Sequence, residues 1–194
     1  MAGKISSLTS AAAAVAFLVG AAAAGSCDTT MSGQTGGSTM TSQETVEGAM
    51  NYTRVDATIA CGGATSPEAM TGLKALGFNS VINLREAGEE GVDVEASRAA
   101  AEAAGLRYVH IPFVSASPDP AAVTAFLDVA SDESVYPAYV HCSGGNRAGM
   151  MLMAKRMAVD GWDAERAEEE ARLAGLRSDQ LRDFVIEYMA SHPR

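Results

Sequence analysis

One short segment of the chain concentrates the residues that could do chemistry. Residues 141–147 read His-Cys-Ser-Gly-Gly-Asn-Arg, between an apolar strand pattern that ends at Val140 and a helical pattern that continues through Met150. A glycine-bearing turn that leads into a helix points successive backbone N–H groups at one position, where an oxyanion can bind. The same partial positive charge favours the thiolate of a cysteine placed inside the turn.

Cys142 and Arg147 have complementary chemistry in such a turn. Cys142 supplies a nucleophile, and the planar guanidinium of Arg147 matches two oxygens of a phosphoryl group. The alternative is a buried structural cysteine in a tight turn, with Arg147 in a surface ion pair. A cysteine, two glycines and an arginine together at a strand-to-helix junction favour the oxyanion site. The predicted phosphate-binding residues are Ser143, Gly144, Gly145, Asn146, Arg147 and Ala148.

The elements that must position this turn alternate between strands and helices. Strands are predicted at 55–60, 80–84, 108–111 and 138–140, and helices at 66–76, 92–104, 119–130, 146–159, 164–174 and 178–190. Ser66 is expected to cap the first helix. The alternation predicts an α/β fold with a small, mostly parallel sheet, covered by helices on both faces, and three helices after the cysteine turn. Ligands bind beyond the carboxyl ends of such strands, so chemistry is expected after Leu84, Ile111 and Val140.

The first 50 residues predict export rather than a fold. Lys4 precedes an alanine-rich apolar run over 11–24, which is the layout of a secretory signal peptide. The four residues that end at Cys27 read Ala-Gly-Ser-Cys and resemble a bacterial lipobox, whose cysteine is lipidated. Cleavage without lipidation and an uncleaved anchor are the alternatives. Residues 28–50 have no hydrophobic period and predict a flexible tether.

The predicted organisation follows from these segments. Residues 1–26 form a signal peptide, residues 27–50 a tether, and residues 51–194 a folded domain. The expected location is the periplasm or cell envelope, with membrane contact only through a lipid anchor.

Charge and composition disfavour several classes of function. The 194 residues hold 14 Lys and Arg against 24 Asp and Glu, a net charge of −10. Nucleic acid is therefore not expected as a partner, because binding its backbone needs a basic face. Three cysteines are too few for a disulfide framework. The histidines and cysteines lack metal-ligand spacing, so no metal or cofactor is expected.

The cysteine turn resembles that of the protein tyrosine and dual-specificity phosphatases, whose pattern is His-Cys, five residues, then Arg. Only four residues separate Cys142 from Arg147 here, as in a bacterial branch of dual-specificity-like phosphatases. That branch is related to the phosphatase domain fused to some NAD kinases and to beta-lactamase-hydrolase-like phosphatase domains. The resemblance covers about residues 51–176, and the other matching stretches are 65–68, 81–85, 108–112 and 160–162.

The resemblance implies a cysteine-phosphatase fold and a hydrolase that acts on a phosphorylated protein or a small phosphate ester. Cys142 would form a phosphocysteine intermediate and Arg147 would bind the phosphoryl group. His141 would support the turn rather than act as a base. The residue after the arginine is often Ser or Thr in the superfamily, where its hydroxyl helps the thiolate leave. Ala148 stands there in this chain, which implies slower breakdown of the intermediate.

A general acid is the remaining requirement, because the leaving oxygen must be protonated from within hydrogen-bond reach. The family uses an aspartate on a separate loop, and Asp119 follows the third predicted strand. Its alternative role is to cap the next helix. Glu86, Glu89 and Glu90 after the second predicted strand are rival acids, or simply a solvated charged loop.

Two rival functions stay open. Rhodanese-like sulfurtransferases use a cysteine loop of this shorter length, although Asn83-Leu84-Arg85 differs from the Asp-x-Arg that they tend to show. A phosphate-binding module without turnover is the second rival, which Ala148 favours.

Cys61 raises a separate possibility of redox control. It follows the first predicted strand, so it could approach Cys142 and protect the nucleophile as a reversible disulfide. The alternative is a small core residue.

Overall fold

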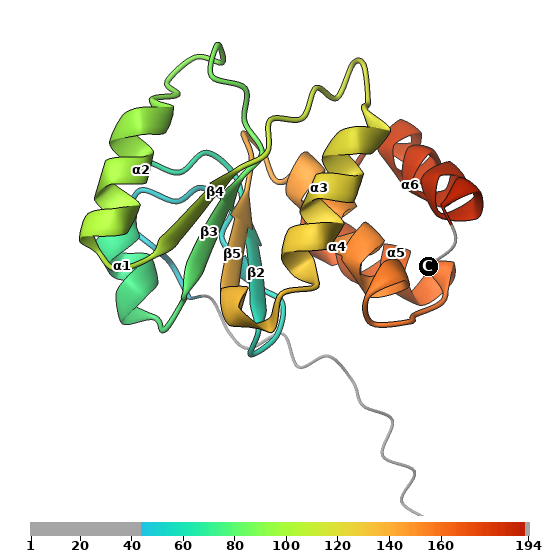
Figure 1. Ribbon diagram of the computed structural model, residues 1–194, viewed down its shortest axis with the longest axis horizontal. Helices are drawn as coiled ribbons and strands as arrows, with labels where there is room; N and C mark the ends of the chain where they lie inside the picture. The colour runs from blue at the N-terminus through green and yellow to red at the C-terminus, as the bar shows by residue number, and fades with distance from the viewer. Residues whose placement is uncertain (1–43, 193–194) are drawn as a thin grey trace, which may run out of the picture. The chain divides into compact units, whose positions relative to one another are not determined.

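The computed structural model of the protein describes residues 44–192 (Figure 1). The predicted signal peptide, Cys27 and the predicted tether as far as residue 43 lie outside the described residues. Five strands form one sheet in the order β1-β2-β5-β3-β4. They are β1 (Thr53–Arg54), β2 (Ile59–Gly62), β3 (Ser80–Asn83), β4 (Arg107–His110) and β5 (Ala138–His141). Only the pairing of β1 with β2 is antiparallel, so the predicted, mostly parallel sheet is confirmed.

Helices cover both faces of the sheet, as predicted (Figure 1). One face carries α1 (Ala69–Ala75) and α2 (Val94–Ala103). The other carries α3 (Pro120–Ala130), α4 (Asn146–Ala158), α5 (Ala164–Leu173) and α6 (Asp179–Ser191), and a short 3-10 turn, η1 (Glu133–Val135), precedes β5. The last three of these helices follow the cysteine turn. Among them, α4 contacts β2, β5, α3, α5 and α6 and is buried along most of its length.

Side chains of the strands alternate between two cores, because successive residues of a strand face opposite sides of the sheet. Ile82, Val140 and Cys142 lie in the core on the side of α3 to α6. Val81 and Tyr139 lie in the smaller core beneath α1 and α2. The nucleophile predicted from the sequence therefore lies on the α4 side of β5.

The strand predicted at 55–60 is wrong in its bounds, and the short β1 (Thr53–Arg54) before it was not predicted. Strand character was expected over 55–60, whereas β2 spans Ile59–Gly62. The carboxylate of Asp56 accepts hydrogen bonds from the backbone N–H groups of Thr58 and Ile59, at 2.6 and 3.0 Å. Aspartate often closes a turn in this way, and the turn keeps 56–58 out of the sheet.

The predicted cap of the first helix is wrong. Helix α1 starts at Ala69 with Glu68 at its N-cap position, and no side chain caps it. Ser66 instead lies in the turn before the helix, where its backbone N–H donates to the carbonyl of Gly48 at 2.8 Å. A backbone hydrogen bond to the N-terminal segment therefore holds Ser66 in the turn that precedes the helix.

The predicted tether ends too late in the sequence. Val46 is buried in the smaller core, and Met50 exchanges backbone hydrogen bonds with Gly63 and Ala64. Residues 44–50 therefore pack against the domain, which was expected to begin at residue 51. Their composition resembles that of the preceding tether, and pairing with the loop after β2 is what orders them.

Helix α4 is held tightly against its neighbours. A Cβ added to Gly149 would lie 2.5 Å from the backbone nitrogen of Leu176, so only glycine allows this approach. Near the other end of the helix, Arg156 forms ion pairs with Asp56, Asp160 and Glu170. These contacts fix the position of α4 and hence of the turn that precedes it.

Candidate active site

Cys142 follows β5 directly, at the carboxyl edge of the sheet between β2 and β3. Its backbone N–H donates to the carbonyl of Gly62 at 3.2 Å, and the N–H of Ala64 donates to the carbonyl of Ser143 at 2.8 Å. The side chain is buried, and its Sγ accepts a hydrogen bond from the N–H of Gly145 at 3.1 Å. A backbone donor at this distance stabilises a thiolate.

The cysteine loop, residues 142–147, ends in a helix N-terminus without a side-chain cap. Its N-cap residue is Gly145, with φ at 97° in the left-handed region that favours glycine. Capping side chains are present on four other helices, from Asp93, Asp119, Asp163 and Ser178. The first-turn amides of α4 have no carbonyl four residues earlier within the helix, which suits an anion. The structure thus places the uncapped start of α4 beside Cys142, and the binding of phosphate by residues 143–148 stays a prediction.

Arg147 is buried, and its guanidinium is held by carbonyl groups from two other loops. Nη1 donates to the carbonyl of Leu84 at 3.1 Å, after β3, and to that of Phe113 at 2.9 Å, after β4. Nη2 donates to the hydroxyl of Ser143 at 3.0 Å. Arg147 is therefore bonded to the cysteine loop through Ser143, while carbonyl groups after β3 and β4 hold the other side of its guanidinium.

Glu89 forms a bidentate ion pair with Arg147 and was proposed from sequence only as a rival acid. Its two carboxylate oxygens accept from Nη1 and Nη2 of Arg147, and one of them also accepts from Nε of Arg85. Burial alone would raise the pKa of Glu89, but the hydrogen bonds from Arg147 and Arg85 outweigh it and lower the pKa to about 2. Glu89 is thus ionised at neutral pH and has no proton to give a leaving group.

His141 faces away from the cysteine and toward the smaller core. Its ring stacks on Tyr139, with centroids 5.7 Å apart and an interplanar angle of 9°. Burial lowers the pKa of His141 to about 4, and the positive charges of Arg85 and Arg147 act in the same direction. The imidazole is therefore neutral at neutral pH, which fits support of the loop.

Asp119 lies at the N-cap of α3, where its carboxylate accepts from the N–H of Ala121 at 2.9 Å. The capping role considered from the sequence is therefore present. The loop that carries Asp119 starts beside the site, because the carbonyl of Phe113 binds Arg147. Its side chain is exposed, so capping does not bury the carboxylate.

Distant residues contact the cysteine loop, and no sequence pattern predicted these contacts. Arg177 Nη2 donates to the carbonyl of Gly144 at 2.5 Å, and Asn51 Nδ2 reaches the same oxygen at 3.3 Å. The side-chain oxygen of Asn146 accepts from the backbone N–H groups of Arg177 and Ser178. This oxygen joins the cysteine loop to the connection between α5 and α6.

Cys61 and Cys142 are both buried and free in the structure, and their reversible disulfide stays a prediction. Cys61 pairs with Val140 in the sheet, two residues before Cys142. Strand spacing then places the two cysteine Cα atoms roughly 8 Å apart, and more than about 7 Å cannot be bridged without backbone movement. Burial raises the pKa of Cys61, so it remains a thiol, and its Sγ lies 3.9 Å from the carbonyl oxygen of Ala148.

Two further features concern the described part of the chain. Within residues 44–192, no group of three or more His, Cys, Asp or Glu side chains is placed to hold a metal ion. None of the helices in that range is long and apolar enough to cross a membrane.

Comparison with known proteins decides the family. Residues 38–185 match the model of the DSP-PTPase phosphatase fused to NAD+ kinase. The chain belongs to this family. This is the family that the resemblance of the cysteine loop predicts.

Relatives and solved structures agree with this family assignment. The beta-lactamase hydrolase-like protein of Xylella fastidiosa is 35% identical over 117 residues, which is 58% of this chain and only 26% of that protein. A DUF442 protein from Shewanella putrefaciens superimposes with a TM-score of 0.64 at 17% identity, over 77% of this chain and 97% of that one. P. aeruginosa TpbA in complex with pTyr gives 0.54 at 21% identity, over 74% and 92%. At these identities, the two structures support the cysteine-phosphatase-like fold.

Replacement of Glu89 by Gln tests the support of Arg147. We expect a loss of unfolding free energy on the order of 1–3 kcal/mol at neutral pH, because a charge-assisted pair is weakened. The pKa of Glu89 is lowered from 4.5 to about 2 in the fold, so the stabilisation is complete above about pH 4.5 and is lost as the pH falls toward 2. Urea unfolding of both proteins from pH 7 to pH 3 should show their difference shrink below pH 4.5.

Glu90→Gln provides the matched control, because the exposed Glu90 contributes only its backbone carbonyl to Arg85. A loss in Glu89→Gln that is independent of pH, or equal to that of the control, would contradict the assigned role of the ion pair.

Proposed function

We propose that the protein hydrolyses phosphate monoesters through a phosphocysteine formed on Cys142. The observation that carries the proposal is the hydrogen bond from the N–H of Gly145 to Cys142 Sγ, at the uncapped start of α4, with the Arg147 guanidinium bonded to the same loop. This arrangement offers a nucleophile and a set of donors around one point. This arrangement fits the transfer of a phosphoryl group better than it fits a cysteine that is buried for structural reasons.

The proposed reaction has two displacements. The Cys142 thiolate attacks phosphorus, the S–P bond forms and the P–O bond to the ester breaks, while the leaving oxygen takes a proton from an acid. Water then attacks phosphorus and gives a proton to the carboxylate that the acid became in the first step, the S–P bond breaks, and inorganic phosphate leaves with the thiolate and the acid restored. The guanidinium of Arg147 and the first-turn amides of α4 stabilise the charge on the equatorial oxygens in both steps.

Arg147 suits this role because it remains charged. Burial would lower the pKa of Arg147, but hydrogen bonds to Glu89 and the nearby charge of Cys142 outweigh it and raise the pKa. Both Nη groups already have acceptors, one of them the hydroxyl of Ser143 in the cysteine loop, so an arriving phosphoryl group would have to replace some of these acceptors.

Asp119 is the proposed general acid. It is carried by the loop that leaves the sheet at β4 and passes Arg147 at Phe113. Glu89 is unsuitable because its pKa is lowered to about 2. Among the acidic residues predicted from the sequence, Asp119 is also the one for which the family pattern provides a separate loop.

The proposed substrate is a phosphorylated protein or a small phosphate ester. TpbA, whose fold is similar, has been solved with pTyr, and the family model describes phosphatases. The net charge of −10 argues against a nucleic-acid substrate, because its backbone would be repelled.

A rhodanese-like sulfurtransferase activity is the second candidate. One observation favours it: four residues, not five, separate Cys142 from Arg147, and a smaller loop suits a sulfane sulfur. In that reaction the Cys142 thiolate would take the outer sulfur of thiosulfate as a persulfide with release of sulfite, and then pass this sulfur to cyanide as thiocyanate with the thiolate restored.

Cys142→Ser tests the covalent mechanism. Release of phosphate from an aryl phosphate should fall by about a thousandfold or more, because serine is a far weaker nucleophile in this loop. Binding of vanadate or phosphate should persist, since the amides and Arg147 remain. Cys61→Ala is the matched control and should retain activity. Full activity in Cys142→Ser would reject the phosphocysteine.

The same pair of variants separates the rival functions. Turnover of thiosulfate with cyanide, lost in Cys142→Ser and present without phosphate release, would establish the sulfurtransferase. Phosphate binding without either turnover would establish a recognition module.

Asp119→Asn tests the acid. A good leaving group departs without a proton, so we expect alkyl phosphate hydrolysis to slow roughly a hundredfold while nitrophenyl phosphate changes little. The amide can still accept the hydrogen bond from Ala121, so the cap of α3 is retained. Equal losses on both substrates would assign Asp119 to capping alone.

We also propose export with a lipid anchor at Cys27, on the basis of Lys4, the apolar run and the lipobox-like residues. The mature protein should begin at Cys27 with a lipid mass and partition with membranes. Mass spectrometry that finds an intact Met1 in a cytosolic fraction would reject export, and an unlipidated start elsewhere would reject only the anchor.

A further inference from the structure

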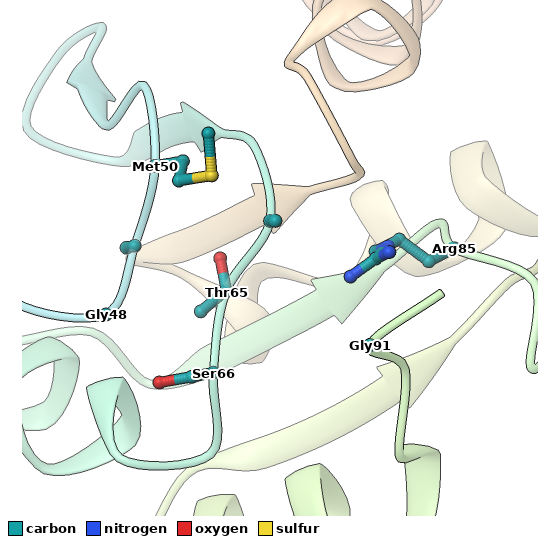
Figure 2. Close-up of a pocket in the computed structure, with 8 residues that line it drawn as sticks. Gly48, Met50, Thr65, Ser66, Arg85 and Gly91 are labelled. Atoms are coloured by element: carbon teal, nitrogen blue, oxygen red, sulfur yellow. The ribbon is translucent and has the colours of Figure 1, made fainter. Parts of the chain in front are cut away.

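A cavity of about 340 Å³ opens beside the cysteine loop, and the proposed mechanism uses none of its walls. Residues 48–50 and 64–66 line one part, and Arg85 and Gly91 line the other (Figure 2). These segments include the loops after β2 and β3, and β5 with its cysteine loop lies between those two strands. The wall at Ala64 is bonded directly to Ser143. The cavity is therefore next to the position of the scissile phosphate.

Arg85 is the charged residue among those that line this cavity. Figure 2 shows its side chain extending from the end of β3 toward Thr65. Nε is bonded to Glu89 and Nη2 to the carbonyl of Glu90, whereas Nη1 has no partner among the described residues. The residue is only 8% exposed. A guanidinium with an unused N–H group at a largely buried position favours an anionic acceptor.

The position of Arg85 relative to Arg147 limits the size of the ligand. Oε2 of Glu89 accepts from Arg85 Nε at 3.1 Å and from Arg147 Nη2 at 2.9 Å, so these two nitrogens lie no more than about 6 Å apart. Two guanidinium groups flank one carboxylate, which leaves a net positive charge. A ligand that reaches both must carry its two anionic groups within a few bonds of each other.

We propose that the cavity is a second anion site, and that the substrate is a phosphate ester whose organic part carries a second anionic group. The scissile phosphate binds the cysteine loop, the second group binds Arg85, and the carbon framework lies against Ala49, Met50 and Ala64. The inference rests on the proposed phosphatase function and adds its substrate class. A neutral ester of the same shape leaves Arg85 without its acceptor.

Two probes of matched shape test the site: 3-carboxyphenyl phosphate and 3-carbamoylphenyl phosphate. The measured quantity is the ratio of their kcat/KM values, in which a general loss of activity cancels. We expect about a tenfold preference for the carboxylate, as one charge-assisted hydrogen bond provides. Dissociation constants measured with Cys142→Ser give the same ratio for binding alone.

Substitutions of Met50 change the charge of the cavity without touching the catalytic groups. Met50 lines the cavity with a 59% exposed side chain. Met50→Glu should abolish the preference, Met50→Lys should increase it several-fold, and Met50→Gln should leave it unchanged. Arg85→Gln should also abolish it. Glu89→Gln should slow both probes, because it weakens the support of Arg147, but it should not abolish the preference, because Arg85 keeps its charge.

The outcomes distinguish the two proposals. Hydrolysis of both probes at equal rates, or a preference that Met50→Glu leaves intact, would overturn the second anion site and spare the phosphatase. If Glu89→Gln and Arg85→Gln change the ratio of the two kcat/KM values equally, Arg85 supports Arg147 and does not bind the second anionic group. If neither probe is hydrolysed or bound, the phosphatase proposal fails and the second site fails with it.

Discussion

The guanidinium of Arg147 is held by acceptors from several parts of the fold, and the phosphate-binding role proposed for it depends on them. Fixing a long side chain costs up to about 2 kcal/mol of rotamer entropy. Carbonyl groups after β3 and β4 and the carboxylate of Glu89 supply the compensating hydrogen bonds. These acceptors come from separate parts of the chain and meet only because β5, β3 and β4 are neighbours in the sheet. The position of the Arg147 guanidinium therefore depends on the order of the strands in the sheet.

Because the strand is pleated, two successive residues at the end of β5, His141 and Cys142, face opposite sides of the sheet. Cys142 faces the α4 side and meets the Gly145 amide, whereas His141 stacks on Tyr139 in the other core and stays neutral. Helix α4 leaves its first-turn amides uncapped, which costs stability, because buried donors prefer partners. Its tight approach at Gly149 and ion pairs along its length offset that loss.

Local patterns predicted most elements and the cysteine loop, because apolar periodicity and glycine-bearing turns are properties of neighbouring residues. They could not predict that Glu89 pairs with Arg147, since a charged loop looks the same whether solvated or bonded to a residue 58 positions away. Residues 44–50 were assigned to the tether because their composition continues it, and only pairing with the loop after β2 orders them. The contact of Arg177 with Gly144 likewise depends on tertiary packing alone.

In a cysteine loop that has alanine at position 148, another group must assist the departure of the thiolate in the proposed mechanism. In the larger superfamily a hydroxyl after the arginine helps the thiolate to leave, and the buried Ala148 has none to offer. The left-handed conformation of Gly145 turns its own N–H toward Cys142 Sγ instead, at 3.1 Å. In the proposed mechanism, a backbone amide next to a helix N-terminus would take over the electrostatic role of that hydroxyl when the thiolate leaves. The requirement for a left-handed residue at that point explains why a glycine stands there, because other side chains rarely adopt φ near 97°.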